Sequence, residues 1–277
     1  ISDCLVGSEM CIRDRALMRY RIMVEVEYLL SLVELKSFQK KRSLSKKTLS
    51  SLRSLYTEFS DKDFKQIKKI ESKTNHDVNA VVVFISEKLE KISRQDLIPL
   101  VHFGLTSEDI NNTAYSLMTK GATKNIMVPA IKNVLKELKK LARRTKSLPM
   151  LSLTHGQPAT TTTLGKELAV FISRIERELV LINEINLLAK FSGATGSYAA
   201  HKAAFPKANW SVFAKKFIKR LGLGQSPITS QVEPGDSIAE LLHSYVRINN
   251  ILSDFSLDMW LYICLLYTSD AADDDHC

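Results

Sequence analysis

The stretch that decides the fold class is "GDSIAELLHSYVRINNILSDFSLDMWLYI", residues 235–263. Its apolar residues recur with the period of an α-helix, and after Gly235 it contains no glycine or proline that would end one. A helix of this length exceeds the average of about 11–12 residues and depends on other helices to bury its apolar face. The stretch therefore predicts a bundle of long helices.

The same period dominates the rest of the chain, and alternating period-2 segments are nearly absent. Further helices are expected over residues 16–35, 45–60, 61–92 with a polar break near 73–77, 107–147 interrupted only by Pro129, 158–191, and 210–223. We predict an all-α protein. A smaller N-terminal helical domain, residues 15–105, precedes a long-helix bundle, residues 106–263.

The two ends of the chain differ from this interior. Residues 1–14 and 264–277 lack periodic continuity with their neighbours and resemble translated adapter sequence. We expect both segments to pack poorly against the body; a genuine arm and tail are the alternative. All four cysteines lie near these ends, so the interior has no disulfide framework and no thiolate metal site. Without a signal-peptide pattern or an apolar run of about 18 residues, the expected location is the cytoplasm.

The net charge of the chain is +9. The first fifteen residues hold two basic and three acidic residues and the last fourteen hold four Asp, so 37 basic and 23 acidic residues remain between them, a net of +14. This excess favours an anionic partner, either nucleic acid or a polyanionic small molecule. Lysine-rich runs at helical spacing, such as "KELKKLARRTK", look like solvated helix faces and explain much of it.

Four polar clusters stand where helices are expected to begin: residues 74–78, 102–113, 154–163 and 228–236. Taken singly, each fits a helix cap; Thr106 or Ser107 with Asp109 resembles a capping box, and Pro158 suits a first helical turn. A helix N-terminus also binds carboxylate or phosphate. Capping does not require histidine, yet three of the six histidines lie in these clusters, namely His76, His102 and His155. We therefore favour a site for an anionic substrate.

Other kinds of site are not indicated. The "GATG" run at residues 193–196 lacks the Lys-Ser/Thr of a phosphate loop, and HExxH, CxxC and GxSxG motifs are absent. Nothing resembles a DNA-reading module. The sequence therefore predicts no metal, no cofactor, no nucleic-acid partner and no membrane partner.

Five motifs of the sequence resemble those of a known family: "TNHDVNAV", "HFGLTSEDINNT", "THGQPATTTTLGKE", "SGATGSYAAHKAAFP" and "QVEPGDSIAELL". Together, and in this order, they resemble the adenylosuccinate lyases of the fumarase/aspartase superfamily, over residues 15–263. The resemblance implies a bundle of the fumarase/aspartase type, truncated here. It also implies homotetramers in which each site is built from three subunits, so His155 is expected far from Thr106 and Ser107 within one chain.

The resemblance implies a reaction as well. Such enzymes release fumarate by anti β-elimination from adenylosuccinate and from the succinyl-carboxamide ribotide of purine synthesis. A base removes a proton from the succinyl carbon, the C–N bond breaks, and a general acid protonates the departing nitrogen. By the resemblance, His155 matches this general acid. Imidazole suits the role because it exchanges protons near neutral pH.

The remaining matches concern substrate binding. Thr106 and Ser107 match residues that hold a succinyl carboxylate. Asn75, His76 and Asp77 match a triplet near the nucleotide phosphate, and Gln231 matches a substrate-contacting glutamine. His102 lies in the site region without an assigned role.

The chain departs from the family in one large respect. The flexible loop that carries the family's base, a serine, has no counterpart up to Ile263, nor does a leader with an arginine–tyrosine pair. We therefore expect no measurable turnover from this chain alone. Two alternatives stay open: another lyase of the superfamily, or a basic helical bundle that binds nucleic acid and is not an enzyme.

Overall fold

The computed structural model describes residues 2–35, 38 and 44–266. Contacts between Cα atoms divide the chain into two compact units, which are described separately. The first unit comprises residues 1–121 and 186–235, and the second comprises residues 122–185 and 236–277. Helices predominate in both units, so the predicted all-α class is confirmed.

The first unit contains most of the shorter helices. Its elements are α1 (Ser2–Val33), α3 (Lys46–Thr57), α4 (Asp61–Thr74), α5 (Asp77–Lys91), the 3₁₀ helix η1 (Gln95–Leu100), α6 (Ser107–Ala122), β3 (Leu188–Ala189), α9 (Ala199–Ala204), α10 (Trp210–Arg220) and β4 (Gly224–Gln225). Strands β3 and β4 form one short parallel pair. The helices expected over 16–35, 45–60, 61–92 and 210–223 are confirmed, and the polar break near 73–77 separates α4 from α5.

Helix α1 forms the core of the first unit. From Arg21 to Val33 nearly every residue is buried, so this part of the helix is covered on all sides rather than on one stripe. Its polar side chains therefore need partners. Burial alone would raise the pKa of Glu27, but hydrogen bonds from Arg53 and Tyr56 lower it below its usual value.

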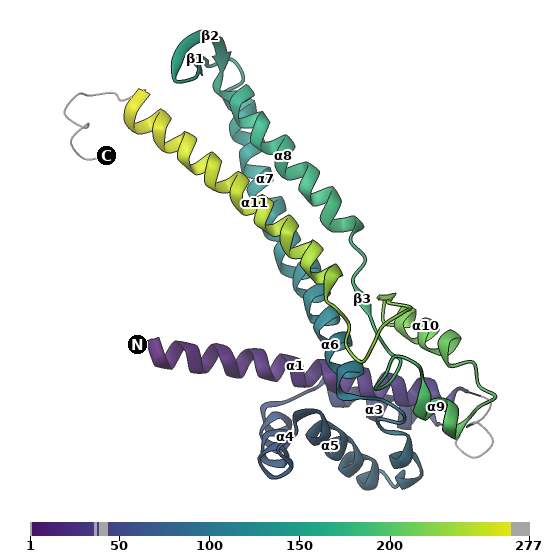
Figure 1. Ribbon diagram of the computed structural model, residues 1–277. Helices are drawn as coiled ribbons and strands as arrows, with labels where there is room; N and C mark the ends of the chain where they lie inside the picture. Colours follow the sequence, from purple (N-terminus) through teal and green to yellow (C-terminus); the bar gives the residue numbers. More distant parts are fainter. Residues whose placement is uncertain (1, 36–37, 39–43, 267–277) are drawn as a thin grey trace. The chain divides into compact units, whose positions relative to one another are not determined.

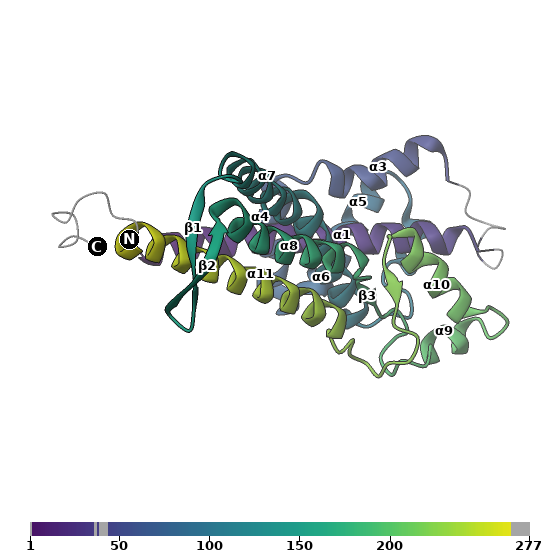
Figure 2. The same ribbon diagram turned by 90° about the horizontal axis from the view of Figure 1, so that it is seen from above.

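The second unit consists of long helices and a hairpin. Its elements are the π-helical turn η2 (Thr123–Met127), α7 (Val128–Arg144), β1 (Pro149–Thr154), β2 (Gln157–Thr163), α8 (Leu164–Glu184), α11 (Asp236–Leu261) and the π-helical turn η3 (Tyr262–Leu266). Figures 1 and 2 show α7, α8 and α11 running alongside one another, with the hairpin at one end of α7 and α8.

The three long helices run antiparallel in sequence order. The N–H of Gly165 at the start of α8 donates to the carbonyl of Thr145 at the end of α7. Ion pairs join Arg174 to Asp254 and Glu178 to Arg247, so residue numbers fall along α11 as they rise along α8, and the two helices are antiparallel. The predicted bundle of long helices is therefore confirmed, and the π-helical turn lies just before Pro129, where an interruption was expected.

The helix expected over residues 158–191 is wrong at both ends. Residues 157–163 form strand β2, which pairs antiparallel with β1, and α8 begins only at Leu164. The threonine run explains the difference, because β-branched residues favour strands. Pro158 therefore lies in a strand rather than in a first helical turn. At the other end α8 stops at Glu184, and the chain continues into β3.

The predicted chain ends fall largely outside the described residues. Residues 2–14 continue helix α1 in backbone conformation, but the packing of side chains 1–13 and of residues 267–277 is not described. The predicted domain boundary at residue 105 stays a prediction; the compact units of this chain change over near residues 121, 185 and 235. Within the described residues, no helix is both long and apolar enough to cross a bilayer.

Candidate active site

The first unit brings together four of the predicted site residues at the N-terminus of α6: His76, Thr106, Ser107 and Gln231. The first-turn N–H groups of an α-helix lack intrahelical partners and carry partial positive charge. Two side chains from distant segments meet the first residues of α6. The Nε2 atom of His76 lies 3.4 Å from the Oγ of Ser107, and the Nε2 of Gln231 lies 3.5 Å from the Oγ1 of Thr106.

His76 has a structural role in addition to its contact with Ser107. It is the N-cap of α5, and its Nδ1 accepts a hydrogen bond from the N–H of Asn79 at 3.1 Å. A histidine therefore serves as a cap here, so its presence at the start of a helix is not by itself a sign of a site. Because Nδ1 accepts, the proton of the neutral ring sits on Nε2, which faces Ser107 and can donate.

The neighbours of His76 are explained by local structure. Asn75 ends α4 in the left-handed conformation, with φ of 50°, a position that favours glycine or asparagine. Asp77 pairs with Arg21 at 2.6 Å. Burial alone would raise the pKa of Asp77, but the charge of Arg21 and a hydrogen bond from Val78 lower it. Asn75 and Asp77 therefore set the turn that presents His76.

The capping box expected at α6 is half formed. The carboxylate of Asp109 accepts the N–H of Thr106 at 2.8 Å, whereas the N–H of Asp109 donates to the carbonyl of Thr106 rather than to its hydroxyl. The hydroxyl of Thr106 faces Gln231 instead. Both hydroxyls of the Thr106–Ser107 pair thus remain available at the start of the helix.

His102 and Glu25 form a pair beside this region. The Nδ1 atom of His102 lies 2.6 Å from Oε1 of Glu25, which is fully buried. Burial alone would lower the pKa of His102, but the hydrogen bond and charge of Glu25 raise it above its usual value. His102 is therefore held in place by Glu25, with its backbone at φ of 56°.

His155 belongs to the second unit and lies on the hairpin rather than at the start of a helix. Thr154 pairs with Gln157, so His155 and Gly156 form a two-residue turn, and both have positive φ, 53° and 74°. These are the signs required by a type I′ turn. His155 is exposed at the tip of the hairpin. The predicted separation of His155 from Thr106 and Ser107 stays a prediction, because the two units are described separately.

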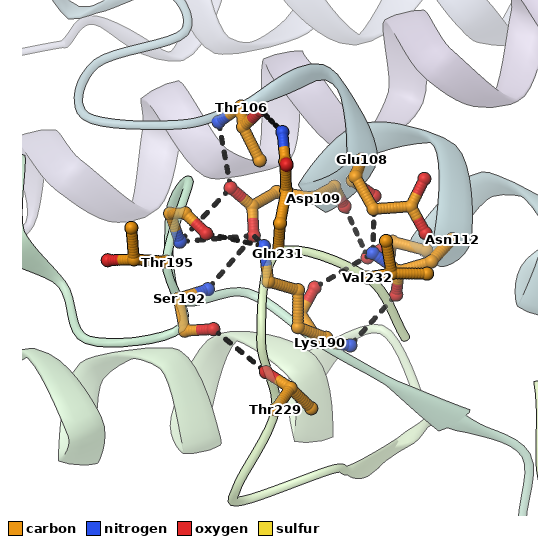
Figure 3. Close-up of polar contacts among 12 residues, drawn as sticks. Thr106, Glu108, Asp109, Asn112, Lys190, Ser192, Thr195, Thr229, Gln231 and Val232 are labelled. Atoms are coloured by element: carbon orange, nitrogen blue, oxygen red, sulfur yellow. Dashed lines mark hydrogen bonds and ion pairs between the residues drawn. The ribbon is translucent and has the colours of Figure 1, made fainter. Parts of the chain in front are cut away.

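The sequence analysis missed the residues that hold this site together. Asp109 was considered only as a cap, and Lys190 was not singled out. The structure buries both completely and places Lys190 Nζ 2.8 Å from Asp109 Oδ1 (Figure 3). The N–H groups of Ser192 and Gly193 also donate to Asp109. Only the presence of Asp109 inside the "TSED" motif could have pointed to it. Among the described residues, no cluster of ligating side chains could hold a metal ion.

The chain is similar in sequence to curated adenylosuccinate lyases. The chain is 41% identical over 251 residues to adenylosuccinate lyase from Buchnera aphidicola (subsp. Acyrthosiphon pisum), 41% over 261 residues to that from Dictyostelium discoideum, and 40% over 253 residues to that from Escherichia coli K12. These matches cover 90–92% of this chain and 55–56% of the relatives. The chain thus spans about half the length of the curated relatives it matches.

Solved structures share the fold. The β-carboxy-cis,cis-muconate cycloisomerase from Acinetobacter calcoaceticus has a TM-score of 0.71 at 23% identity, over 90% of this chain and 56% of its own. A fumarate lyase from Mesorhizobium sp. BNC1 has a TM-score of 0.71 at 21% identity, over 89% of this chain and 54% of its own. The sequence model of the family described as "Lyase" matches residues 10–265. The chain therefore belongs to this lyase family, within the fumarase/aspartase superfamily.

Proposed function

We propose that this chain supplies the amino-terminal and central parts of an adenylosuccinate lyase, a C–N lyase that releases fumarate from adenylosuccinate and from the succinyl-carboxamide ribotide. The observation that carries the proposal is the meeting of His76, Ser107, Thr106 and Gln231 at the N-terminus of α6. The curated relatives, all adenylosuccinate lyases, support the choice of substrate.

The start of α6 suits the succinyl end of the substrate. A carboxylate placed there would accept the unsatisfied first-turn N–H groups and the hydroxyls of Thr106 and Ser107. The Nε2–H of His76 would donate from one side and the amide of Gln231 from the other. Donors that are already oriented stabilise charge that develops on the carboxylate as the proton is removed.

His155 is the proposed general acid. The type I′ turn fixes its backbone at the tip of the hairpin and leaves the ring exposed. From there the imidazolium would donate a proton to the departing nitrogen as the C–N bond breaks and the C=C bond of fumarate forms. No residue of this chain is assigned as the base.

We propose that the assembled enzyme is a homotetramer in which His155 of one subunit serves the Thr106–Ser107 site of another. Large apolar side chains are exposed along all three long helices, among them Val134, Leu141, Val170, Val180, Leu242, Val246 and Trp260. Such apolar faces mark contacts with other chains. Light scattering after size-exclusion chromatography tests the tetramer. A cytoplasmic location also stays a prediction.

The experiment uses a hybrid enzyme, in which residues 15–263 of this chain replace the matching region of one of the curated adenylosuccinate lyases. Fumarate release is measured with adenylosuccinate, argininosuccinate and malate. Release from adenylosuccinate alone supports the proposal, whereas a preference for another substrate assigns the chain to a different lyase of the superfamily. No release from any substrate, together with DNA binding that weakens steeply with salt, would favour a nucleic-acid binder.

A further inference from the structure

The carboxylate of Asp109 connects the start of α6 to the loop that follows β3 (Figure 3). Its Oδ2 accepts the N–H of Thr106 at 2.8 Å and its Oδ1 accepts the N–H of Ser192 at 2.9 Å. The N–H of Gly193 lies 3.2 Å from both oxygens. Three backbone donors from two segments that are distant in sequence thus converge on one buried carboxylate.

Lys190 neutralises this carboxylate. Its Nζ lies 2.8 Å from Asp109 Oδ1 and donates to the carbonyl of Gly193 at 2.6 Å. Asn112, one turn beyond Asp109 on α6, fixes the backbone of Lys190 on both sides, accepting its N–H at 2.8 Å and donating to its carbonyl at 3.0 Å. The side chains of Asp109 and Lys190 are both fully buried.

Burial of this pair needs a reason other than stability. Desolvation of two charges costs about as much as their attraction returns, and apolar replacements of buried pairs are often neutral or stabilising. What the pair does here is local. The Asp109 carboxylate accepts the N–H of Thr106, while the hydroxyl of Thr106 faces Gln231.

The loop held by Asp109 also contacts the segment that carries Gln231. Ser192 Oγ lies 3.3 Å from Thr229 Oγ1, and Gly196, at φ of 74°, leaves no room for a Cβ beside the carbonyl of Thr229. The Asp109–Lys190 ion pair therefore holds in place both segments that contribute donors for a substrate carboxylate. These are the Thr106–Ser107 pair at the start of α6 and the loop that carries Gln231. Because the two charges of the ion pair cancel, the pair adds no net negative charge next to the position where a substrate carboxylate would bind.

We propose that the Asp109–Lys190 ion pair positions the carboxylate-binding subsite at the start of α6, and so determines affinity for the fumarate end of the substrate but not for the nucleotide end. The inference rests on the proposed function. Neither residue touches substrate; both act through Thr106, Ser107 and Gln231.

The test compares inhibition by the two products, fumarate and AMP, in the hybrid enzyme. The Asp109→Leu/Lys190→Met double variant removes both charges together, so no uncompensated charge stays buried. Asp109→Asn is a second, isosteric variant. We expect the inhibition constant of fumarate to rise about tenfold in both, as for a lost hydrogen bond to a charged group, and that of AMP to stay within about twofold.

A matched control removes a different ion pair by the same substitutions. In Asp63→Leu/Lys88→Met, the pair at 2.8 Å joins the start of α4 to the end of α5, and Asp63 also caps α4. This variant should lose stability, because a cap contributes about 1 kcal/mol, yet both inhibition constants should be unchanged. The control therefore separates loss of stability from loss of positioning.

The outcomes are distinct. Unchanged fumarate inhibition in the double variant, or an equal rise for fumarate and AMP, would overturn the inference. Failure of both the double variant and Asp109→Asn to fold would assign the pair to the fold alone and overturn it as well. An unsubstituted hybrid that neither releases fumarate nor is inhibited by it would overturn the proposed function, and the inference with it.

Discussion

The Nε2 atom of His76 lies 3.4 Å from the hydroxyl of Ser107, although 31 positions separate the two residues along the chain. His76 reaches this place because its other ring nitrogen caps helix α5. One histidine thus fixes the start of α5 and faces the start of α6. A substitution at His76 can therefore remove the contact with Ser107 and keep the cap of α5.

His76→Asn is expected to keep the cap and lose the contact with Ser107. Asparagine is among the strongest N-cap residues, but its side chain is too short to reach α6. In the hybrid enzyme we expect a thermal midpoint close to that of the unsubstituted hybrid and a fall in kcat/KM of about 10–100-fold. His76→Ala is the matched comparison and should lose the cap as well, about 1 kcal/mol of stability. Equal kcat/KM for the His76→Asn variant and the unsubstituted hybrid would exclude a role of His76 in substrate binding.

Ser107→Ala removes one proposed donor to the carboxylate without touching the backbone of α6. We expect a fall of about tenfold or more in kcat/KM for adenylosuccinate, with unchanged stability, because the contact of the Ser107 hydroxyl with His76, at 3.4 Å, is exposed. Ser116→Ala is a control on the same helix. Its hydroxyl donates to the carbonyl of Leu188 at 2.6 Å, so this variant should lose stability rather than affinity. The reverse pattern would contradict the carboxylate subsite.

His201 should make the stability of the first unit depend on pH. Burial lowers its pKa to about 4, from an ordinary value of 6.5, against the smaller opposing effect of Asp109. Between these values the unfolded chain binds a proton that the folded chain does not. The free energy of unfolding should therefore decrease as pH falls from 6.5 to 4, by up to about 3 kcal/mol.

The measurement is urea unfolding of the chain at pH 7 and pH 4.5, followed by the fluorescence of Trp210, whose ring lies 4.7 Å from that of His201. His201→Gln keeps a donor for the Tyr28 oxygen, 2.9 Å from Nε2, and should flatten this pH dependence. His243→Gln, at an exposed position on α11, serves as the control. If the free energy of unfolding of His201→Gln depends on pH as strongly as that of the unsubstituted chain, groups other than His201 account for the pH dependence.

Substitution by alanine should have opposite effects on stability at two glycines that lie in helices. A Cβ on Gly165 would lie 2.6 Å from the Cα of Lys146 and would also meet the carbonyl of Ala142, so α7 and α8 would have to separate. Gly165→Ala should cost about 1–3 kcal/mol. A Cβ on Gly121 would meet only the hydroxyl of Tyr20, the end of a flexible side chain, and the helix would gain about 0.5–1 kcal/mol. Urea midpoints of the two variants check both signs; a neutral Gly165→Ala would mean that the helices pack less closely here.

Helical periodicity predicted most of the fold because the long helices bury apolar faces against one another. It failed at residues 158–163, because "PATTTT" directly precedes the helical apolar pattern of α8 and was included in it, whereas its β-branched side chains and the His155–Gly156 turn favour a hairpin. The candidate site could be predicted in part. The motifs identified His76, Thr106, Ser107 and Gln231, whereas the Asp109–Lys190 pair joins segments far apart in sequence, and no local pattern marks such a partnership.

The most direct test of the account is fumarate release from adenylosuccinate by the hybrid enzyme and by its His155→Ala variant. A positioned general acid contributes about 10²–10⁴-fold to a rate. We predict fumarate release by the hybrid, and a loss of this order in kcat for His155→Ala with little change in the inhibition constant of fumarate. Activity in the His155→Ala variant equal to that of the unsubstituted hybrid would contradict the account.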